Sequence, residues 1–270
     1  MTVAPVALTP QDVRLACRNG TWKEPSTAGV CAGHVQANLI IVPEKYAADF
    51  RNLCARNPVP CPLLGETKVG DPTVPAHLAV NADIRTDAPL YNIYRGGKLI
   101  ETKANLLDEW KDDSVGFFIG CSYSFEAALT SAGLKPRQIE INRNVPMYKT
   151  SVPLYASGAF TGRMVVSMRP YPADLVEKAR DVTRPFIRAH GEPIAWGFEG
   201  GKTLGVNDPT GEYPDFGDAS EIREGDVPVY WACGVTPQLA VMDSQLPELI
   251  LGHAPGHMLV LDMRDEDVCA

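Results

Sequence analysis

An unbroken run of large aliphatic residues, Leu39–Val42, limits the fold more than any other feature of the chain. Such a run is typical of a strand covered on both faces, because a strand with one solvated face alternates apolar and polar residues. Pro43 then predicts the start of a helix. The same order of apolar strand and helix recurs after residues 115 and 229. We therefore predict the α/β class, with a mixed sheet covered by helices in three layers and a second, smaller α+β unit of two layers.

Local signals predict several further elements. Thr9-Pro10 predicts a helix start, because threonine caps helices and proline suits their first turn. Residues 90–102 predict a hairpin that turns at Gly96-Gly97. Strands are expected at 138–141 and 163–169, and a long helix from Pro172.

The chain is long enough for two domains. Residues 197–226 are rich in glycine, proline and aspartate and have little periodicity, which is typical of a lid or a connection between domains. We predict a main α/β domain formed by residues 1–114 plus 225–270. Residues 115–224 would then form the smaller α+β domain.

Charge and composition favour a small-molecule partner. The formal net charge is -8, whereas surfaces that bind nucleic acid or anionic lipid need clustered lysine and arginine. No apolar run is long enough to cross a membrane, and the first residues do not resemble a secretory signal. Seven widely spaced cysteines without a Cys-x-x-Cys pair favour reduced thiols. We expect a cytoplasmic protein that binds neither nucleic acid nor membranes, and a homodimer from the frequency of that state among oligomers.

The turn Gly120–Ser124 is the strongest candidate for chemistry. An apolar strand ends there and a helix is expected to follow from about Ser124 to Ala132, so unpaired backbone amides would face one spot and favour an anion. Cys121 would lie where the helix start lowers a thiol pKa. Ser122 and Ser124 are candidates to bind substrate, or simply to cap the helix, and Glu126 would be a first-turn acid.

A second turn, at Cys233, repeats this arrangement. The strand 229–233 ends in cysteine, and Thr236 is expected to cap the helix that follows. If the two strands are parallel, Cys121 and Cys233 lie on the same rim of one sheet, where open α/β sheets bind ligands. Cys233 and Thr236 are therefore candidate substrate-binding residues.

His253 and His257 are spaced like a helical zinc pair, but Pro255 and Gly256 between them favour a loop. No third ligand is evident, so we expect no metal ion. One histidine could act as a general acid or base, or both could only bind backbone in a tight turn.

A third polar segment contains Arg143, Asn144 and Tyr148. Arg143 could hold a substrate carboxylate through two parallel hydrogen bonds, with Asn144 beside it. Tyr148 could orient or protonate the substrate. The alternative is an exposed strand end whose charged groups are solvated.

Several short segments, taken together, resemble the family of hydro-lyases named for D-glutamate cyclase. The order and number of these segments make the resemblance specific, and it spans nearly the whole chain: Pro25–Gly29, Gly33–Leu39, Gly120–Glu126, Arg143–Tyr148, Val166–Pro170, Trp231–Gln238 and His253–Met258.

The resemblance implies a lyase that eliminates water from a small carboxylic or amino acid, as in closure of D-glutamate to 5-oxoproline. His257 or His253 would move the proton, Tyr148 or Glu126 would assist the departing oxygen, and Cys121 would line the pocket or act as base. No cofactor is expected. Two alternatives remain open: a cysteine-dependent amidohydrolase that acts on lactams or cyclic amides with Cys121 as nucleophile, and a non-catalytic subunit that binds a metabolite.

Overall fold

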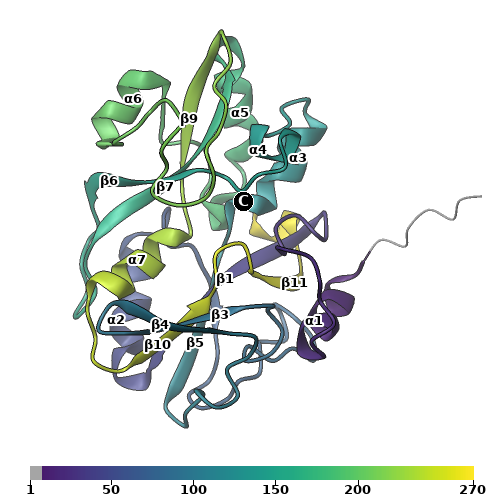
Figure 1. The fold of residues 1–270 in the computed structure, drawn as a ribbon, viewed down its shortest axis with the longest axis vertical. Coiled ribbons are helices and arrows are strands. Elements are labelled where there is room, and N and C mark those ends of the chain that lie inside the picture. Colours follow the sequence, from purple (N-terminus) through teal and green to yellow (C-terminus); the bar gives the residue numbers. More distant parts are fainter. Residues whose placement is uncertain (1–7) are drawn as a thin grey trace, which may run out of the picture.

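The computed structural model describes residues 8–270 and contains two β-sheets, one above the other in Figure 1. The larger sheet has seven strands, and β11 pairs with β1 beside the path β2-β5-β1-β10-β3-β4. Their bounds are β2 (Leu63–Glu66), β5 (Ser114–Ile119), β1 (His34–Pro43), β10 (Leu249–His253), β3 (Tyr91–Arg95), β4 (Lys98–Lys103) and β11 (Leu259–Arg264). The smaller sheet has the order β6 (Met147–Pro153), β7 (Arg163–Pro172), β9 (Asp226–Ala232) and β8 (Ala195–Trp196). The α/β class with two sheets of unequal size is confirmed.

Helices cover both sheets. In Figure 1, α1 and α2 lie with the larger sheet, α3 to α6 with the smaller sheet, and α7 between the two. The helices are α1 (Pro10–Arg18), α2 (Glu44–Arg56), α3 (Glu126–Ser131), α4 (Arg137–Glu140), α5 (Val176–Thr183), α6 (Gly197–Leu204) and α7 (Val235–Asp243), with 3-10 turns η1 (Ser122–Phe125), η2 (Ala173–Leu175), η3 (Ile187–Ala189) and η4 (Asp265–Val268). Within residues 8–270, no helix is both long and apolar enough to span a membrane.

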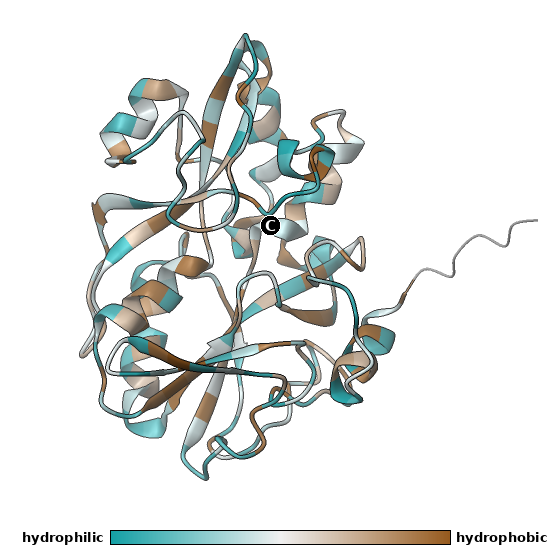
Figure 2. Cartoon of the chain, in the orientation of Figure 1, coloured by the Kyte–Doolittle hydropathy of each residue, from teal (hydrophilic) through white to brown (hydrophobic). Residues whose placement is uncertain are grey.

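The predicted central strand is confirmed as β1, which is buried on both faces. Leu39 and Ile41 belong to one hydrophobic cluster, whereas Ile40 and Val42 belong to a second on the opposite face. Both clusters also contain residues of the smaller sheet, such as Trp231 in the first and Ala232 in the second. Figure 2 shows hydrophobic residues along the strands of both sheets. The two sheets therefore share their hydrophobic core.

Several locally encoded elements are also confirmed. Thr9 caps α1 in a reciprocal capping box with Asp12, and α2 begins directly after Pro43. The hairpin of β3 and β4 turns at Gly96 and Gly97, both with positive φ. Each of these signals lies within a few residues of the element that it specifies.

Four predictions about secondary structure are wrong. Pro172 does not start a long helix, because it ends β7 and is followed by η2 and the eight-residue α5. Residues 138–141 are not a strand, because Pro136 with φ -59° starts the short helix α4. The expected single helix 124–132 is a 3-10 turn, η1, followed by the six-residue α3. Finally, the larger sheet is not of mixed direction, because every ladder described within residues 8–270 is antiparallel.

The two sheets cut across the predicted domain boundaries. β5 was assigned to the smaller domain, but it pairs with β1 and β2 in the larger sheet. β9 was assigned to the main domain, but it is the central partner of β7. Domains drawn along the sheets would place β5 with the larger sheet and β9 with the smaller sheet. Because the two sheets share their hydrophobic core, the domain boundaries stay a prediction.

Candidate active site

The turns that follow β5 and β9 meet at a small hollow of about 30 Å³ that is partly open to solvent. The two strands belong to different sheets, so the expectation that Cys121 and Cys233 share one sheet rim is wrong. Both cysteines nevertheless line the same hollow. Its lining comprises Asn38, Cys121, Ser122, Tyr123, Asn144, Val145, Met147, Cys233, Gly234, Val235, Gln238, His253, Pro255, Gly256 and Met258.

Asn38 on β1 joins the two turns. Its side-chain amide donates a hydrogen bond of 3.1 Å to the carbonyl of Gly120. A Cβ atom on Gly234 would lie 2.1 Å from the same amide nitrogen and 3.2 Å from the Gly120 carbonyl oxygen. A Cβ atom on Gly120 would lie 1.9 Å from the carbonyl oxygen of Arg188. Glycine at 234 therefore lets the two turns approach closely, and glycine at 120 lets the first turn pack against the Arg188 backbone.

The two thiols are protonated at neutral pH. Burial raises the pKa of Cys121 to about 12, against the opposing effects of the Tyr123 backbone amide and the Asn38 side chain. Burial likewise raises the pKa of Cys233 to about 11, although the Val235 amide and the Arg169 guanidinium favour the thiolate. The prediction of a lowered Cys121 pKa is therefore wrong, because desolvation of the thiolate outweighs the few amides of a short turn.

His253 at the end of β10 faces the hollow as a neutral hydrogen-bond donor. Its Nδ1 accepts the backbone N–H of Leu39 at 3.0 Å, so the proton of the neutral ring lies on Nε2. Burial lowers the pKa of His253 to about 4. A neutral imidazole with an occupied Nδ1 can donate a hydrogen bond through Nε2 but cannot accept a proton there.

Neutral amide and hydroxyl groups complete the lining. Gln238 on α7 donates to the hydroxyl of Tyr94 at 2.9 Å. The hydroxyl of Tyr123 donates to the side-chain oxygen of Asn144, which also accepts the amide of Val145 at 3.0 Å. These bonds fix the carbonyl end of Asn144 and leave its amide hydrogens free to bind a ligand oxygen.

A buried ion pair supports the turn at Cys121. Arg169 on β7 is fully buried and donates to Glu126 through Nε and Nη2, with an Nε distance of 3.0 Å. Its Nη2 also donates to the Ser122 hydroxyl at 3.1 Å, and its Nη1 donates to Ser167. Burial raises the pKa of Glu126, against the opposing effect of the Arg169 charge. Glu126 thus positions Arg169, which in turn holds the turn that carries Cys121.

The comparisons with known proteins identify the family. Residues 115–262, which include both cysteine turns and β10, match the family model described as D-glutamate cyclase. This chain belongs to the D-glutamate cyclase family. A protein of Schizosaccharomyces pombe named as a putative hydro-lyase is 49% identical over 94% of this chain and 84% of its own length. Similarly named proteins of Bacillus subtilis and Stutzerimonas stutzeri are each 49% identical over 97% of this chain and cover 99% and 96% of their own lengths.

Among solved structures, a nitrogen repressor-like protein from Methanococcus jannaschii is 10% identical over 88% of this chain and 94% of its own. Its TM-score of 0.38 is too low to support an inference about fold or function.

The predicted site residues of this D-glutamate cyclase family member fall into two groups. The first group lines the hollow and consists of Cys121, Ser122, Asn144, Cys233 and His253. The second group lies outside the lining and consists of Ser124, Glu126, Arg143, Tyr148, Thr236 and His257. Location alone does not test a catalytic role, so these roles stay predictions.

Each residue of the second group has a local environment of its own. Arg143 is exposed and donates to the Ala219 carbonyl at 2.9 Å. Thr236 does not cap α7, since its hydroxyl accepts the Val165 amide at 2.9 Å. The ring of His257 lies 2.8 Å from the Pro255 carbonyl. Tyr148 and Ser124 are buried, and each has a hydroxyl without a partner among the described residues.

Four residues of this site were not predicted from the sequence: Asn38, Tyr123, Gln238 and Arg169. Asn38 and Arg169 both interrupt the apolar residues of strands whose inner positions are all buried. A polar residue in a buried strand needs a partner or a ligand, so this interruption was the available signal.

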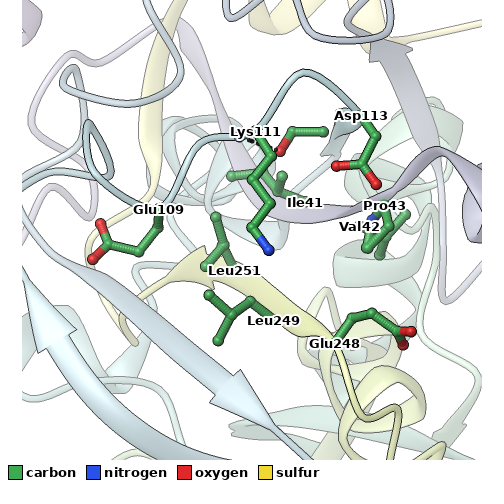
Figure 3. A pocket seen from close by; sticks show the side chains of 10 residues that line it. Ile41, Val42, Pro43, Glu109, Lys111, Asp113, Glu248, Leu249 and Leu251 are labelled. Carbon is green, nitrogen blue, oxygen red and sulfur yellow. Dashed lines mark hydrogen bonds between the residues drawn. The ribbon is translucent and has the colours of Figure 1, made fainter.

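A second hollow of about 50 Å³ lies beside the larger sheet, next to β1 and β10 (Figure 3). Aliphatic side chains such as Leu249 and Leu251 form part of its wall. Two of its three carboxylates, Glu109 and Glu248, pair with Lys103 and Lys45. None of the predicted site residues lines this hollow, so we place the candidate active site at the two cysteine turns.

The cysteine hollow contains no charged side chain at neutral pH. None of its lining residues is lysine, arginine, aspartate or glutamate, and its titratable groups are Cys121, Tyr123, Cys233 and His253. In the described part of the chain, no three or more histidine, cysteine, aspartate or glutamate side chains gather as a metal site would require. The hollow therefore offers neutral hydrogen-bond donors together with thiols.

Proposed function

We propose that this protein is a hydro-lyase that removes water from a small carboxylic or amino acid bound between the two cysteine turns. The observation that carries the proposal is the combination of thiols and neutral donors in one hollow of a D-glutamate cyclase family member. The finer form of the proposal is closure of D-glutamate to 5-oxoproline, the reaction for which the family is named.

Neutral groups would hold the carboxylate. The free amide hydrogens of Asn144 and the Nε2–H of His253 are donors, and a carboxylate oxygen accepts several such bonds. His253 stays neutral at neutral pH because burial lowers its pKa to about 4. We therefore assign His253 to polarise the carbonyl carbon rather than to move a proton.

The thiols would then perform the acid–base steps. In lactam closure the nitrogen attacks the side-chain carboxyl carbon, a C–N bond forms, and a C–O bond breaks. Two protons leave the nitrogen and two reach the departing oxygen, so no net proton or electron is consumed. Cys233 has the lower pKa of the two thiols and is assigned, as its thiolate, to take the first proton from nitrogen while the Cys121 thiol gives a proton to oxygen. The sulfurs have then exchanged their charge, so the Cys121 thiolate takes the second proton from nitrogen and the Cys233 thiol gives the second proton to oxygen, which restores the starting state.

The test is a mass-spectrometric assay with D-glutamate and a panel of other small amino and hydroxy acids. We expect wild-type protein to form a product 18 Da lighter than one of these substrates. Replacing both Cys121 and Cys233 by serine should lower its rate by at least about 100-fold, the scale of a lost acid–base group. Cys17→Ala is the matched control, since Cys17 is 7% exposed against 6% for both site cysteines but lies on α1. Full turnover by the double variant would contradict the proposal.

The two alternatives are less well supported. A cysteine amidohydrolase needs a thiol beside a proton acceptor, whereas the occupied Nδ1 of His253 makes this residue a donor. A covalent adduct trapped on Cys121 would favour that alternative. Tight binding of one of the panel acids without turnover would instead favour a metabolite-binding subunit.

A further inference from the structure

The thiols of Cys121 and Cys233 are the two side chains of the hollow that can both give and accept a proton. Of the other titratable lining groups, His253 has its acceptor nitrogen occupied by the Leu39 amide. Tyr123 already donates to Asn144, and burial raises its pKa well above the ordinary value. Proton transfer to or from a bound molecule therefore falls to the thiols.

The two thiols reach the hollow from separate elements. Cys121 follows β5 of the larger sheet, and Cys233 follows β9 of the smaller sheet. The turns are in contact, because Gly234 lies against both Asn38 and the Gly120 carbonyl. The two thiols thus line one hollow from two different turns that are in contact.

We propose that Cys121 and Cys233 form a thiol–thiolate pair that exchanges, and inverts, the proton on the carbon next to the substrate carboxylate. One sulfur, as the thiolate, takes the proton from this carbon and leaves the carbon with the electron pair. The other sulfur, as the thiol, gives its proton to the opposite face of the carbon. One C–H bond breaks, one forms, and the two sulfurs exchange their charge, so no oxidant or reductant is needed. The substrate class is a small chiral amino acid or its lactam.

The surroundings of the thiols suit this step. A C–H proton next to a carboxylate is only weakly acidic, and a thiolate desolvated by burial is a far stronger base than a solvated carboxylate. The Tyr123 and Val235 amides face the two sulfurs and would stabilise whichever one is charged. The neutral lining contains no lysine or arginine to pair with a thiolate permanently.

The test measures hydrogen exchange at this carbon in deuterium oxide. Full-length protein is incubated with D-glutamate, L-glutamate, D-5-oxoproline and L-5-oxoproline, and proton NMR follows loss of the Cα–H signal while chiral chromatography follows inversion. We expect exchange with at least one of these pairs. Its rate should rise about tenfold per pH unit between pH 7 and pH 9, as the thiolate population grows.

Single variants distinguish a proton-transfer pair from a structural role. Cys121→Ala and Cys233→Ala should each abolish inversion. Each should also slow Cα–H exchange at least 100-fold for one enantiomer, and the enantiomer affected should differ between the two variants. Cys17→Ala should leave the rates of inversion and exchange unchanged. Circular dichroism checks that every variant is folded. The proposal is overturned if wild-type protein exchanges no Cα–H in any probe. It is equally overturned if each single variant keeps the wild-type exchange, or loses exchange with both enantiomers alike.

This inference rests on the hollow being the active site, as in the proposed function, but the two can fail separately. Water loss changes the mass by 18 Da, whereas exchange adds 1 Da. Exchange without water loss would support the thiol pair and contradict the hydro-lyase. Water loss without exchange would do the reverse.

Discussion

The turns at Cys121 and Cys233 share a sequence pattern, an apolar strand that ends in a cysteine before a helix, but different contacts hold them in place. The Cys121 turn opens the four-residue η1 and is tied by the buried Arg169 to Glu126. The Cys233 turn opens the nine-residue α7 and is tied to the β7 backbone by Thr236. The shorter helix depends on a charged tertiary contact, whereas the longer one needs only a hydroxyl. A similar local pattern can therefore have very different sensitivity to mutation.

Removing the ion pair of Arg169 and Glu126 should produce the largest difference in stability between the two turns. Arg169→Met leaves the Glu126 carboxylate buried without its partner, which costs about 3–5 kcal/mol of unfolding free energy. Chemical denaturation measures this loss. The double variant Arg169→Met with Glu126→Gln should recover part of it, because no charge stays buried. A double variant no more stable than the single one would show that the pair contributes mainly through packing.

Alanine substitution at Gly120 and at Gly234 should give the next largest difference in stability between the two turns. At Gly120 the new methyl group would meet the Arg188 backbone, which cannot move aside, and we expect a loss of about 3 kcal/mol. At Gly234 it would meet the Asn38 side chain, which can shift, and the loss should be closer to about 1 kcal/mol. Thermal melts of the two variants provide the comparison. Equal losses would mean that Asn38 is as fixed as backbone.

Acid pH should also lower the unfolding free energy through the region of the Cys121 turn, because His190 lies beneath this turn. Burial lowers the pKa of His190 from 6.5 to about 4, so the unfolded chain binds more protons between these values. The stabilisation is complete above pH 6.5 and is lost as the pH falls through about 4, which amounts to about 3 kcal/mol.

His190→Asn should flatten this acid decline in a series of denaturation curves. Asparagine suits the positive φ of 80° at this position. An unchanged slope in the His190 variant would assign the decline to other groups.

The hydroxyl that supports the Cys233 turn should matter less than Arg169. Thr236→Val keeps the shape but leaves the buried Val165 amide without its acceptor, at a cost of about 1–3 kcal/mol. Urea unfolding tests this range. Thr236→Ser retains the hydroxyl and should lose less than the valine variant.

The smallest effect concerns thiol reactivity. Burial raises the pKa of Cys121 more than that of Cys233, so Cys233 holds the larger thiolate population. Iodoacetamide should therefore label Cys233 faster than Cys121 at pH 9, as peptide mass spectrometry can measure. Faster labelling of Cys121 would reverse the acid and base roles assigned to the two thiols.

The amino-acid sequence by itself determined the elements whose signals are local. These include α1 with its cap, α2 after Pro43, the β3–β4 hairpin and the two cysteine turns with their preceding strands. Such signals consist of side-chain periodicity, caps and turn residues, which act within one element. Residues 138–141 were mispredicted because polar and apolar residues alternate there as in a strand, whereas Pro136 precedes the short helix α4.

Only the tertiary structure decided which residues meet. β5 and β9 joined different sheets, and this pairing brought Cys121 and Cys233 to one hollow from opposite parts of the fold. It also placed Arg169 beneath one turn and directed the acceptor nitrogen of His253 toward the β1 backbone. Strand pairing depends on contacts between residues far apart in the chain, and burial then sets the pKa values. Local sequence patterns specify neither the strand pairing nor the pKa values.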